Sequence, residues 1–392
     1  MSKRYINMKI TELYIYPIKS LGPLPVQRAR LLRESVEHDR RFMLLKVQPD
    51  GAYSQSPRHD LRCYSINVLT ENIQITYFPE CALFHQRLDG SDIVVAYRVP
   101  SPPIFTPETP EQQTELRVPL APKLEDRELV EVSVGLSPTI AYRMGYPYDQ
   151  WFTGCFGFEA ILVYIGDKGR EVLAHKPRDH YLWRQQQPRQ NGWISSITAH
   201  VPSLGGGGSE RNKKKNEPDQ LTFNDIAPFL VTSRASLRDV SKRLPKGEDM
   251  DIRRFRPNIV VDDDTGSSDS DKLVAWEEDY WGELSVTQRT GGEHRLALTA
   301  NCGRCVSINV DLDKGRPSEG ESGIVLKKLM ADRRVDEGNK YAPVFGRYAF
   351  LAPPREGERE RDDDNVVEIA VGDEIHVTKR LDYRDSWAWP KY

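Results

Sequence analysis

The chain has 392 residues, of which 38% are hydrophobic and 29% charged, and its formal net charge is −3. This length predicts roughly two domains of about 150 residues each plus insertions, and the near-neutral charge does not indicate a polyanionic partner. Five cysteines are an odd and sparse set for a disulfide framework, and no apolar run approaches the roughly 18 residues that span a membrane.

The N-terminal residues 1–10 carry basic side chains but no apolar core of the kind found in secretory signals. We therefore expect a reducing, cytoplasmic location without a membrane span. In such a location three of the cysteines, Cys63, Cys81 and Cys155, are expected to be ordinary buried residues.

Short strands dominate the first half of the chain. Residues 8–16 combine alternation with β-branched and aromatic side chains, which predicts a strand that Pro17 ends. A helix is expected at residues 149–158. The other strands of this half are expected at residues 41–47, 65–69, 73–77, 93–99 and 160–165.

The second half begins with a polar segment, residues 176–220, that contains four consecutive glycines and then Lys213-Lys214-Lys215. This composition predicts a disordered surface insertion, and a basic patch for nucleic acid is the alternative interpretation. A helix is expected at residues 236–244, with Ser233 as its N-cap. Further strands are expected at 258–261, 284–287, 296–299, 306–310, 367–370 and 374–378, a second helix at 322–331, and a charged loop at 355–365.

Many short strands with few helices favour a mainly β fold with some α structure and a β-barrel type of architecture.

Cys302 and Cys305 lie three residues apart in Ala300-Asn301-Cys302-Gly303-Arg304-Cys305. A cation beside a cysteine favours the thiolate, which binds metals and attacks electrophiles. By itself the spacing is compatible with a redox pair, half of a zinc site or a single-thiolate metal site. A zinc site would need two more ligands, and His200 and His294 are not at a recognisable spacing.

Six segments together resemble one family. In chain order they are Tyr16-Pro17-Ile18-Lys19-Ser20, Asp39-Arg40, Asn224-Asp225-Ile226-Ala227-Pro228-Phe229, Arg254-Phe255-Arg256-Pro257-Asn258-Ile259, Glu278-Asp279-Tyr280-Trp281, and Cys302-Gly303-Arg304-Cys305 with Asp311 downstream. The chain is similar to MOSC-domain proteins, and most similar to the mitochondrial amidoxime-reducing component and its bacterial relatives. The resemblance implies an N-terminal MOSC β-barrel domain at 8–150 and a MOSC domain at 151–380, excepting the insertions near 176–220 and 355–365.

The resemblance implies a molybdenum–pterin cofactor, molybdopterin with its molybdenum, held through one cysteine thiolate. The matching residue is Cys305, while Cys302 occupies a position that is often cysteine without being the ligand. A protein thiolate would complete the sulfur ligands of the metal. Arg304 is expected to help keep that thiolate ionised.

The phosphate of the pterin requires cations and hydrogen-bond donors. Lys19, Ser20 and Arg40 match the family positions that anchor it, and arginine suits bidentate phosphate contacts. Taken alone, Lys19 and Ser20 could be a solvated turn, and Arg40 could pair with Glu37 or Asp39.

Three further positions match contacts to the pterin. They are Arg256 and Asn258, at the turn into a strand, and Asp225, whose carboxylate would accept from ring N–H groups. The alternative for Arg256 and Asn258 is that they satisfy the backbone of the loop. Trp281 is expected to be core packing rather than a platform for substrate.

The chain departs from the family pattern in several places. Ile226 and Ala227 stand where hydroxyl residues are common, and an arginine after the first hairpin is missing from Ser54-Gln55-Ser56-Pro57 unless Arg58 replaces it. No membrane anchor and no run of four cysteines for an iron–sulfur domain are recognised, so we expect electrons to come from another protein. In the family this donor is a b-type cytochrome with its flavoprotein reductase.

The resemblance therefore implies an oxidoreductase that removes oxygen from small N-hydroxylated or N-oxygenated substrates at a pocket between the two domains, near Cys305. No general base is recognised in the sequence. The alternative is a non-catalytic protein that carries the molybdenum cofactor or a sulfur atom. Association with mitochondria and pyridoxal phosphate binding are further expectations from the family.

Overall fold

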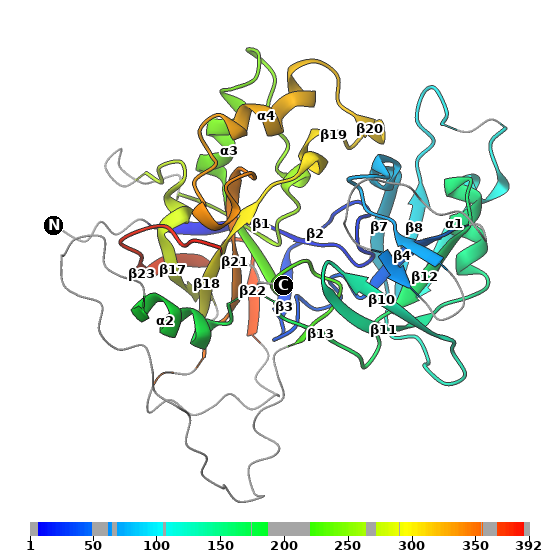
Figure 1. Ribbon diagram of the computed structural model, residues 1–392, viewed down its shortest axis with the longest axis horizontal. Coiled ribbons are helices and arrows are strands. Elements are labelled where there is room, and N and C mark those ends of the chain that lie inside the picture. Colours follow the sequence, from blue (N-terminus) through cyan, green and yellow to red (C-terminus); the bar gives the residue numbers. More distant parts are fainter. Residues whose placement is uncertain are drawn as a thin grey trace, which may run out of the picture.

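The computed structural model describes residues 7–48, 62–64, 69–104, 107–173, 175–186, 220–263, 272–289, 291–353, 355 and 367–387. Strands greatly outnumber helices in this part of the chain. The prediction of a mainly β fold with some α structure is confirmed. The strands form two lobes that lie side by side, one built around a closed barrel and the other around two smaller sheets formed mostly by strands from the first half of the chain (Figure 1).

A closed barrel of seven strands forms the larger lobe. The ring closes because the strand at the start of the chain, β1, pairs antiparallel with β16, with Leu13 opposite Ile259. Closure leaves the ring without an unpaired edge. In order around the ring the strands are β16 (Ile259–Asp263), β15 (Phe229–Ser233), β21 (Val344–Leu351), β18 (Glu293–Gly303), β17 (Trp281–Thr287), β23 (Glu374–Arg380) and β1 (Met8–Ile15).

Inward-facing apolar residues from these strands fill the barrel. Ile10, Leu13, Leu284 and Leu298 are almost fully buried in one cluster, as period-two alternation in strands requires. Trp281 is fully buried among them. It is therefore a core residue, as expected.

In the described part of the chain, the N-terminal lobe consists of two sheets and one α-helix, with short 3₁₀ helices between strands. In the smaller sheet, β7 carries Phe84, whose ring lies 4.6 Å from that of Phe156 in α1. This contact fastens α1 to the lobe. The six-stranded sheet contains, in order, β10 (Leu129–Val134), β11 (Ser137–Arg143), β12 (Ala160–Tyr164), β4 (Phe42–Val47), β6 (Leu69–Asn72) and β5 (Arg62–Tyr64). The smaller sheet contains β7 (Phe84–Asp89), β8 (Asp92–Tyr97) and β9 (Glu115–Pro119). The helix is α1 (Tyr148–Phe156).

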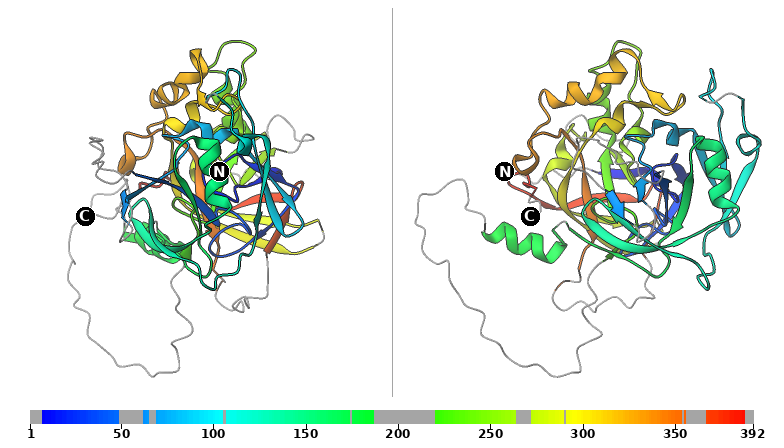
Figure 2. Two further views of the ribbon diagram at one scale, coloured as in Figure 1. Left: turned by 90° about the vertical axis from the view of Figure 1, so that its right-hand side faces the viewer. Right: turned by 45° about the vertical axis from the view of Figure 1, so that its right-hand side comes forward.

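Three more α-helices among the described residues lie around the barrel. α3 (Arg234–Ser241) and α4 (Val325–Met330) lie at one end, and α2 (Pro177–Gln186) lies at the opposite end (Figure 2). The short strand pairs are β2 (Leu24–Val26) with β1, β3 (Arg28–Leu31) with β22 (Val367–Ala370), β13 (Arg170–Glu171) with β14 (Gln220–Leu221), and β19 (Val310–Asp311) with β20 (Arg316–Pro317).

Helices that have clear sequence signals, such as an N-cap residue, lie where the sequence predicts them. α1 corresponds to the helix expected at 149–158. The Ser233 side chain accepts from the backbone N–H of Ser236 at 3.1 Å, so Ser233 is the N-cap of α3. The helix expected at 322–331 is a 3₁₀ turn, Gly320–Ile324, followed by the shorter α4.

Two expected strands are wrong. At residues 73–77 the chain turns, because the N–H groups of Tyr77 and Phe78 both donate to the carbonyl of Gln74. Ile73 and Ile75 are both buried there, so the turn reproduces the alternation of a strand. Residues 306–310 begin with a 3₁₀ helix, Val306–Asn309, in place of a strand.

Part of the expected insertion at 176–220 is also different, because residues 177–186 form α2. Its glycine run and Lys213 to Lys215 lie outside the described residues. The same holds for Ser54 to Arg58 and for most of the charged loop at 355–365. The domain boundaries at 150 and 151 stay a prediction, although β1 belongs to the barrel rather than to the N-terminal lobe.

Candidate active site

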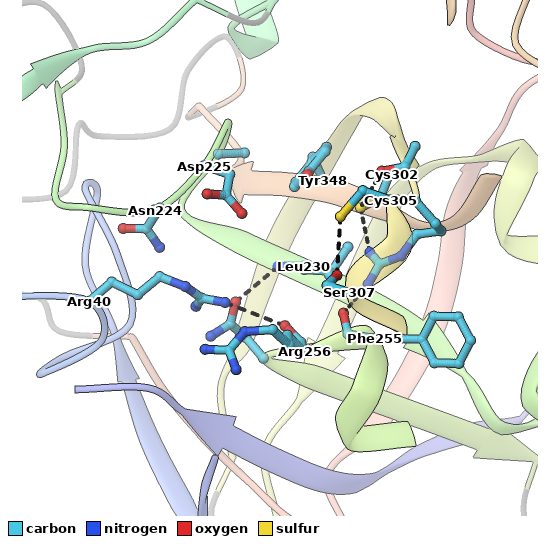
Figure 3. Close-up of a pocket in the computed structure, with 14 residues that line it drawn as sticks. Arg40, Asn224, Asp225, Leu230, Phe255, Arg256, Cys302, Cys305, Ser307 and Tyr348 are labelled. Carbon is cyan, nitrogen blue, oxygen red and sulfur yellow. Dashed lines mark hydrogen bonds between the residues drawn. The ribbon is translucent and has the colours of Figure 1, made fainter. Parts of the chain in front are cut away.

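A cavity of about 570 Å³, counting its open mouth, lies between the barrel and the segments that cross to the N-terminal lobe (Figure 3). Its wall includes Tyr348 of β21, Cys302 at the end of β18 and Asn224 of the loop after β14. Five of the seven predicted site residues line it, namely Arg40, Asp225, Arg256, Asn258 and Cys305. The other two, Lys19 and Ser20, contact members of this set.

The two cysteines have different surroundings. Cys305 is exposed, and its Sγ lies 3.1 Å from Ser307 Oγ and 3.7 Å from Thr76 Oγ1. Cys302 is only 2% exposed, and Arg304 Nη1 lies 2.6 Å from its Sγ. The hydrogen bond from Arg304 to sulfur goes to Cys302, while Cys305 interacts with Arg304 only through space and helps to raise the pKa of the guanidinium. The accessible thiol is therefore Cys305, and it is bordered by two hydroxyl groups.

Arg304 fastens the turn between the cysteines. Its backbone N–H donates to Pro343 O at 2.8 Å, Nη2 donates to Phe255 O, and the guanidinium lies over the ring of Phe255. Burial lowers the pKa of Arg304, but the sulfur of Cys302 and the phenol of Tyr348 outweigh this effect. The pKa of Arg304 is therefore raised above its usual value. Arg304 therefore remains a fixed positive charge beside the cavity.

Three predicted site residues have left-handed backbones. The φ angles are 76° at Ser20, 50° at Arg40 and 54° at Arg256. Residues other than glycine rarely adopt this conformation, and where they do, the strain is often associated with a functional site. Arg40 and Arg256 line the cavity, and the carbonyl of Ser20 accepts from Arg256, so three of the described non-glycine residues with this conformation lie at or next to the site.

A buried tyrosine holds two arginines at fixed positions. The guanidinium carbons of Arg40 and Arg256 lie 4.5 and 4.3 Å from the centroid of the Tyr16 ring. Burial raises the pKa of Tyr16, which keeps the phenol neutral. Asp39 pairs with Arg40 and also accepts from the N–H of Tyr16 at 2.7 Å. The expected Arg40–Asp39 pair is thus present, and Arg40 still lines the cavity.

Lys19 and Asp225 form an ion pair at the edge of the cavity. Lys19 Nζ is buried and also donates to Phe223 O at 2.9 Å. Burial lowers the pKa of Lys19, and Asp225 offsets part of this effect. Surrounding protein raises the pKa of Asp225, but Lys19 and then Arg40 outweigh this and hold it well below its usual range. The Asp225 side chain is nonetheless 63% exposed, so its ionised carboxylate can contact a ligand.

Asn258 is used mainly within the chain. Its Nδ2 donates to Tyr14 O at 3.2 Å, and its Oδ1 accepts from Leu230 N at 3.2 Å. These bonds join β1, β15 and the start of β16. Both polar atoms of the Asn258 side chain therefore form hydrogen bonds with backbone groups, which matches the alternative interpretation.

Cations outnumber carboxylates at this site. Arg256 Nη1 donates to the carbonyls of Ser20 and Leu21, while the buried Nη2 has no hydrogen-bond partner among the described residues.

Sequence reasoning missed Arg170, which is 1% exposed and lies close enough to lower the pKa of Asp225. Tyr16 could have been identified from the sequence, because it is the first residue of the motif that contains Lys19. Tyr348 ends the segment Ala342 to Tyr348, which also fits the family pattern, whereas no local signal marks Arg170.

The residues present suit a phosphate-bearing cofactor with a soft metal. A buried guanidinium N–H without a partner favours an anion, since such a group is costly to leave unsatisfied. An accessible thiol supplies a ligand for a soft metal. Within the described ranges no three His, Cys, Asp or Glu side chains are grouped to hold a metal ion by themselves.

Comparison with known families agrees with this geometry. The MOSC domain family matches residues 218–376, and the MOSC N-terminal beta barrel domain family matches residues 7–157. The chain belongs to the MOSC-domain family. The prediction made from the six segments is thereby confirmed.

Several curated proteins are similar to the chain. Mitochondrial amidoxime reducing component 2 of Macaca fascicularis is 35% identical over 375 residues, which are 94% of this chain and 82% of that protein. The human component 2 is 34% identical over 372 residues, with the same coverage. Human mitochondrial amidoxime-reducing component 1 is 34% identical over 163 residues, and that match spans only 39% of its length. No helix among the described residues is long and apolar enough to cross a membrane.

Proposed function

We propose that this protein is a molybdenum–pterin-dependent oxidoreductase that removes oxygen from N-hydroxylated substrates. The observation that carries the proposal is the exposed Cys305 thiol in a cavity whose lining also includes Arg40, Arg256 and Arg304. The names of the relatives supply the reaction class, since they are amidoxime-reducing components.

The cofactor would be held from both of its ends. Cys305 would bind the metal, and the bound cofactor would supply two-electron redox chemistry. Arg40, Arg256 and Lys19 would bind the phosphate, with Arg256 Nη2 as the donor that still lacks a partner. The backbone of Ser20 fixes Arg256 by accepting from its Nη1 at 3.4 Å.

Asp225 would orient the pterin ring rather than transfer a proton. Its depressed pKa keeps it ionised at neutral pH, so it accepts hydrogen bonds and cannot serve as an acid. Asn258 would act indirectly, by holding the strands that position Arg256.

The substrate would approach Cys305 from the open side of the cavity. Thr76, from the N-terminal lobe, and Ser307, from the barrel lobe, both border the thiol. These hydroxyls would offer hydrogen bonds to the N–O group of a small substrate. This supports the expectation of a pocket between the two lobes.

Electrons would come from a separate donor, and a b-type cytochrome with its flavoprotein reductase is our proposal for it. The relatives are named as mitochondrial. We extend that location to this chain as part of the same proposal, in place of a purely cytoplasmic one.

Elemental analysis for molybdenum and zinc, with pterin detected by its fluorescence after oxidation, tests the cofactor. Turnover of benzamidoxime with reduced viologen then tests the reaction. Molybdenum near stoichiometric with pterin, together with turnover, supports the proposal. Loaded protein without turnover favours the cofactor carrier, and zinc alone or neither metal, from a host that makes the cofactor, contradicts the proposal.

A further inference from the structure

Two segments outside the family matches meet on the far side of the cysteine turn. α2 lies between the two matched ranges, and residues 381–387 follow the second one. They meet at Asp385, which is 3% exposed and accepts from His180 Nε2 at 2.9 Å and from Arg184. The contact joins the two segments through a buried carboxylate.

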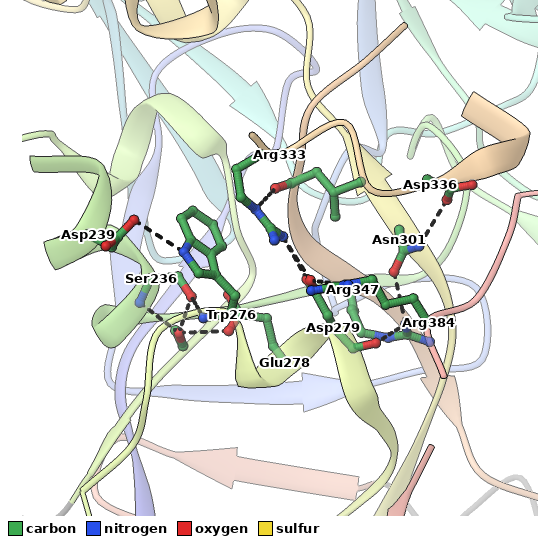
Figure 4. Close-up of polar contacts among 12 residues, drawn as sticks. Ser236, Asp239, Trp276, Glu278, Asp279, Asn301, Arg333, Asp336, Arg347 and Arg384 are labelled. Carbon is green, nitrogen blue, oxygen red and sulfur yellow. Dashed lines mark hydrogen bonds and ion pairs between the residues drawn. The ribbon is translucent and has the colours of Figure 1, made fainter. Parts of the chain in front are cut away.

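From Asp385 the contacts continue to the strand that carries Cys302. Arg347, fully buried, pairs with the Asp385 carboxylate. It also donates to Asn301 Oδ1 at 2.9 Å (Figure 4). Asn301 Nδ2 in turn donates to Asp385 O at 2.7 Å and to Asp336 Oδ2 at 2.9 Å. Every polar atom of the Asn301 side chain is therefore engaged, one residue before Cys302.

A second route reaches the turn from its other side. Asp336 Oδ1 accepts from the backbone N–H groups of Trp387 and Gly338 at 2.7 and 3.0 Å. A Cβ at Gly338 would lie 1.5 Å from Trp387 O, so the two backbones are in direct contact. The same loop then packs on Gly303, where a Cβ would lie 2.6 Å from Asn339 Nδ2.

The geometry points to a clamp, made of α2 and residues 381–387, that positions the Cys302–Cys305 turn. Buried charged networks have fixed geometry, because each member loses its partner if another moves. The clamp acts through Asn301 and the 336–339 loop, and its members do not line the cavity. Asp385, Arg347 and Arg184 are thus positioning residues for Cys305, whose role as metal ligand rests on the proposed function.

Hydrogen–deuterium exchange of the full-length protein tests the clamp without depending on the cofactor. The variants are Asp385→Ala and Arg184→Gln, and Arg384→Gln is the matched control. Arg384 belongs to the same C-terminal segment, but its Nε donates to Asp279 Oδ2, and in the described part of the chain its side chain has no hydrogen bond to Asn301. Asp385→Ala should speed exchange of the amides at 301–305 by about tenfold, and Arg184→Gln by about threefold, while amides of β1 change little.

A purely structural role predicts a different pattern. If exchange at 301–305 rises equally in Arg384→Gln, or rises only together with that of β1, the clamp is wrong. Should Asp385→Ala fail to fold, Arg184→Gln decides, since it removes only the α2 half of the contact.

A spectroscopic measurement distinguishes positioning of Cys305 by the clamp from a general loosening of the Cys302–Cys305 turn. In molybdenum-loaded protein, the electron paramagnetic resonance signal of the metal should shift in Arg184→Gln and stay unchanged in Arg384→Gln. An unchanged signal in both would overturn the positioning role even if exchange rises. If the protein carries no molybdenum, the proposed function fails, while the exchange result still decides whether the clamp exists.

Discussion

Two clusters of buried charge lie in the barrel lobe, and they differ in whether the charges are matched. In the cluster of Figure 4, Asp279 binds Arg333 at 2.8 and 2.9 Å and Arg384 at 2.8 Å, so its carboxylate is fully engaged. At the cavity, Arg256 and Arg304 have no carboxylate partner among the described residues and donate mainly to backbone carbonyls or sulfur. The same residue types thus stabilise the fold in one place and remain available for a ligand in the other.

This difference has a physical basis. A buried guanidinium is tolerated when hydrogen bonds and counter-charges replace its hydration. The Asp279 carboxylate replaces the hydration of its arginine partners. For Arg256, we propose that the cofactor phosphate does so. The comparison predicts that substitutions in the first cluster reduce stability, and those in the second reduce ligand retention.

The largest effect is expected at the thiol. Cys305→Ser should abolish molybdenum retention and activity, because serine is a poor ligand for a soft metal. Cys302→Ser should leave much of both, since Cys302 is buried against Arg304. Metal content per chain, measured for both variants, checks this. Equal loss from the two would contradict the assignment of Cys305 as ligand.

The matched cluster should respond in stability. Asp279→Ala should lower the free energy of unfolding by about 3–5 kcal/mol, because it leaves the buried Arg333 without its carboxylate. Urea denaturation measures this. The control is Glu277→Ala, which removes the partner of the exposed Arg380 and should cost at most about 1 kcal/mol.

Glu278 should make stability depend on pH. It is fully buried, and burial, followed by the charge of Asp279, raises its pKa to about 7. A raised carboxyl pKa means that the folded state holds the proton more tightly than the unfolded state. Its contribution is therefore present at low pH and is lost between about pH 4.5 and 7, an effect of order 3 kcal/mol.

Glu278→Gln isolates this effect. The neutral amide mimics the protonated carboxyl, so the variant should be more stable than the parent above pH 7 and no better below about pH 4. Thermal unfolding across this range measures the difference. A constant offset between the two proteins at every pH would show that Glu278 does not titrate in this window.

The smallest free-energy change is expected at the unmatched cluster. Arg256→Gln should weaken cofactor retention about tenfold, equivalent to about 1.4 kcal/mol, and leave the free energy of unfolding nearly unchanged. Pterin content after dialysis checks retention, and urea denaturation checks stability. A stability loss as large as that of Asp279→Ala would show that Arg256 belongs to the structural class.

Several elements follow from short stretches of sequence. α3 begins at Arg234 because the hydroxyl of the preceding Ser233 caps its first turn, and Pro17 closely follows the end of β1 at Ile15. In both cases the controlling atoms are a few residues apart, so the sequence alone determines the outcome. The spacing of Cys302 and Cys305 is equally local, but by itself it is compatible with three kinds of site.

Tertiary structure decided the rest. The barrel closes through β1 and β16, which are about 250 residues apart, and Arg170 reaches the site through the fold rather than through any motif. Alternation at 73–77 and 306–310 was read as strand, because buried turns place apolar residues inward with the same spacing. Which cysteine contacts Arg304, and whether the polar atoms of Asn258 are free, depends on contacts between distant segments. The sequence determined which chemical groups the site contains, and packing decided which of them remain available, because only packing brings their partners together.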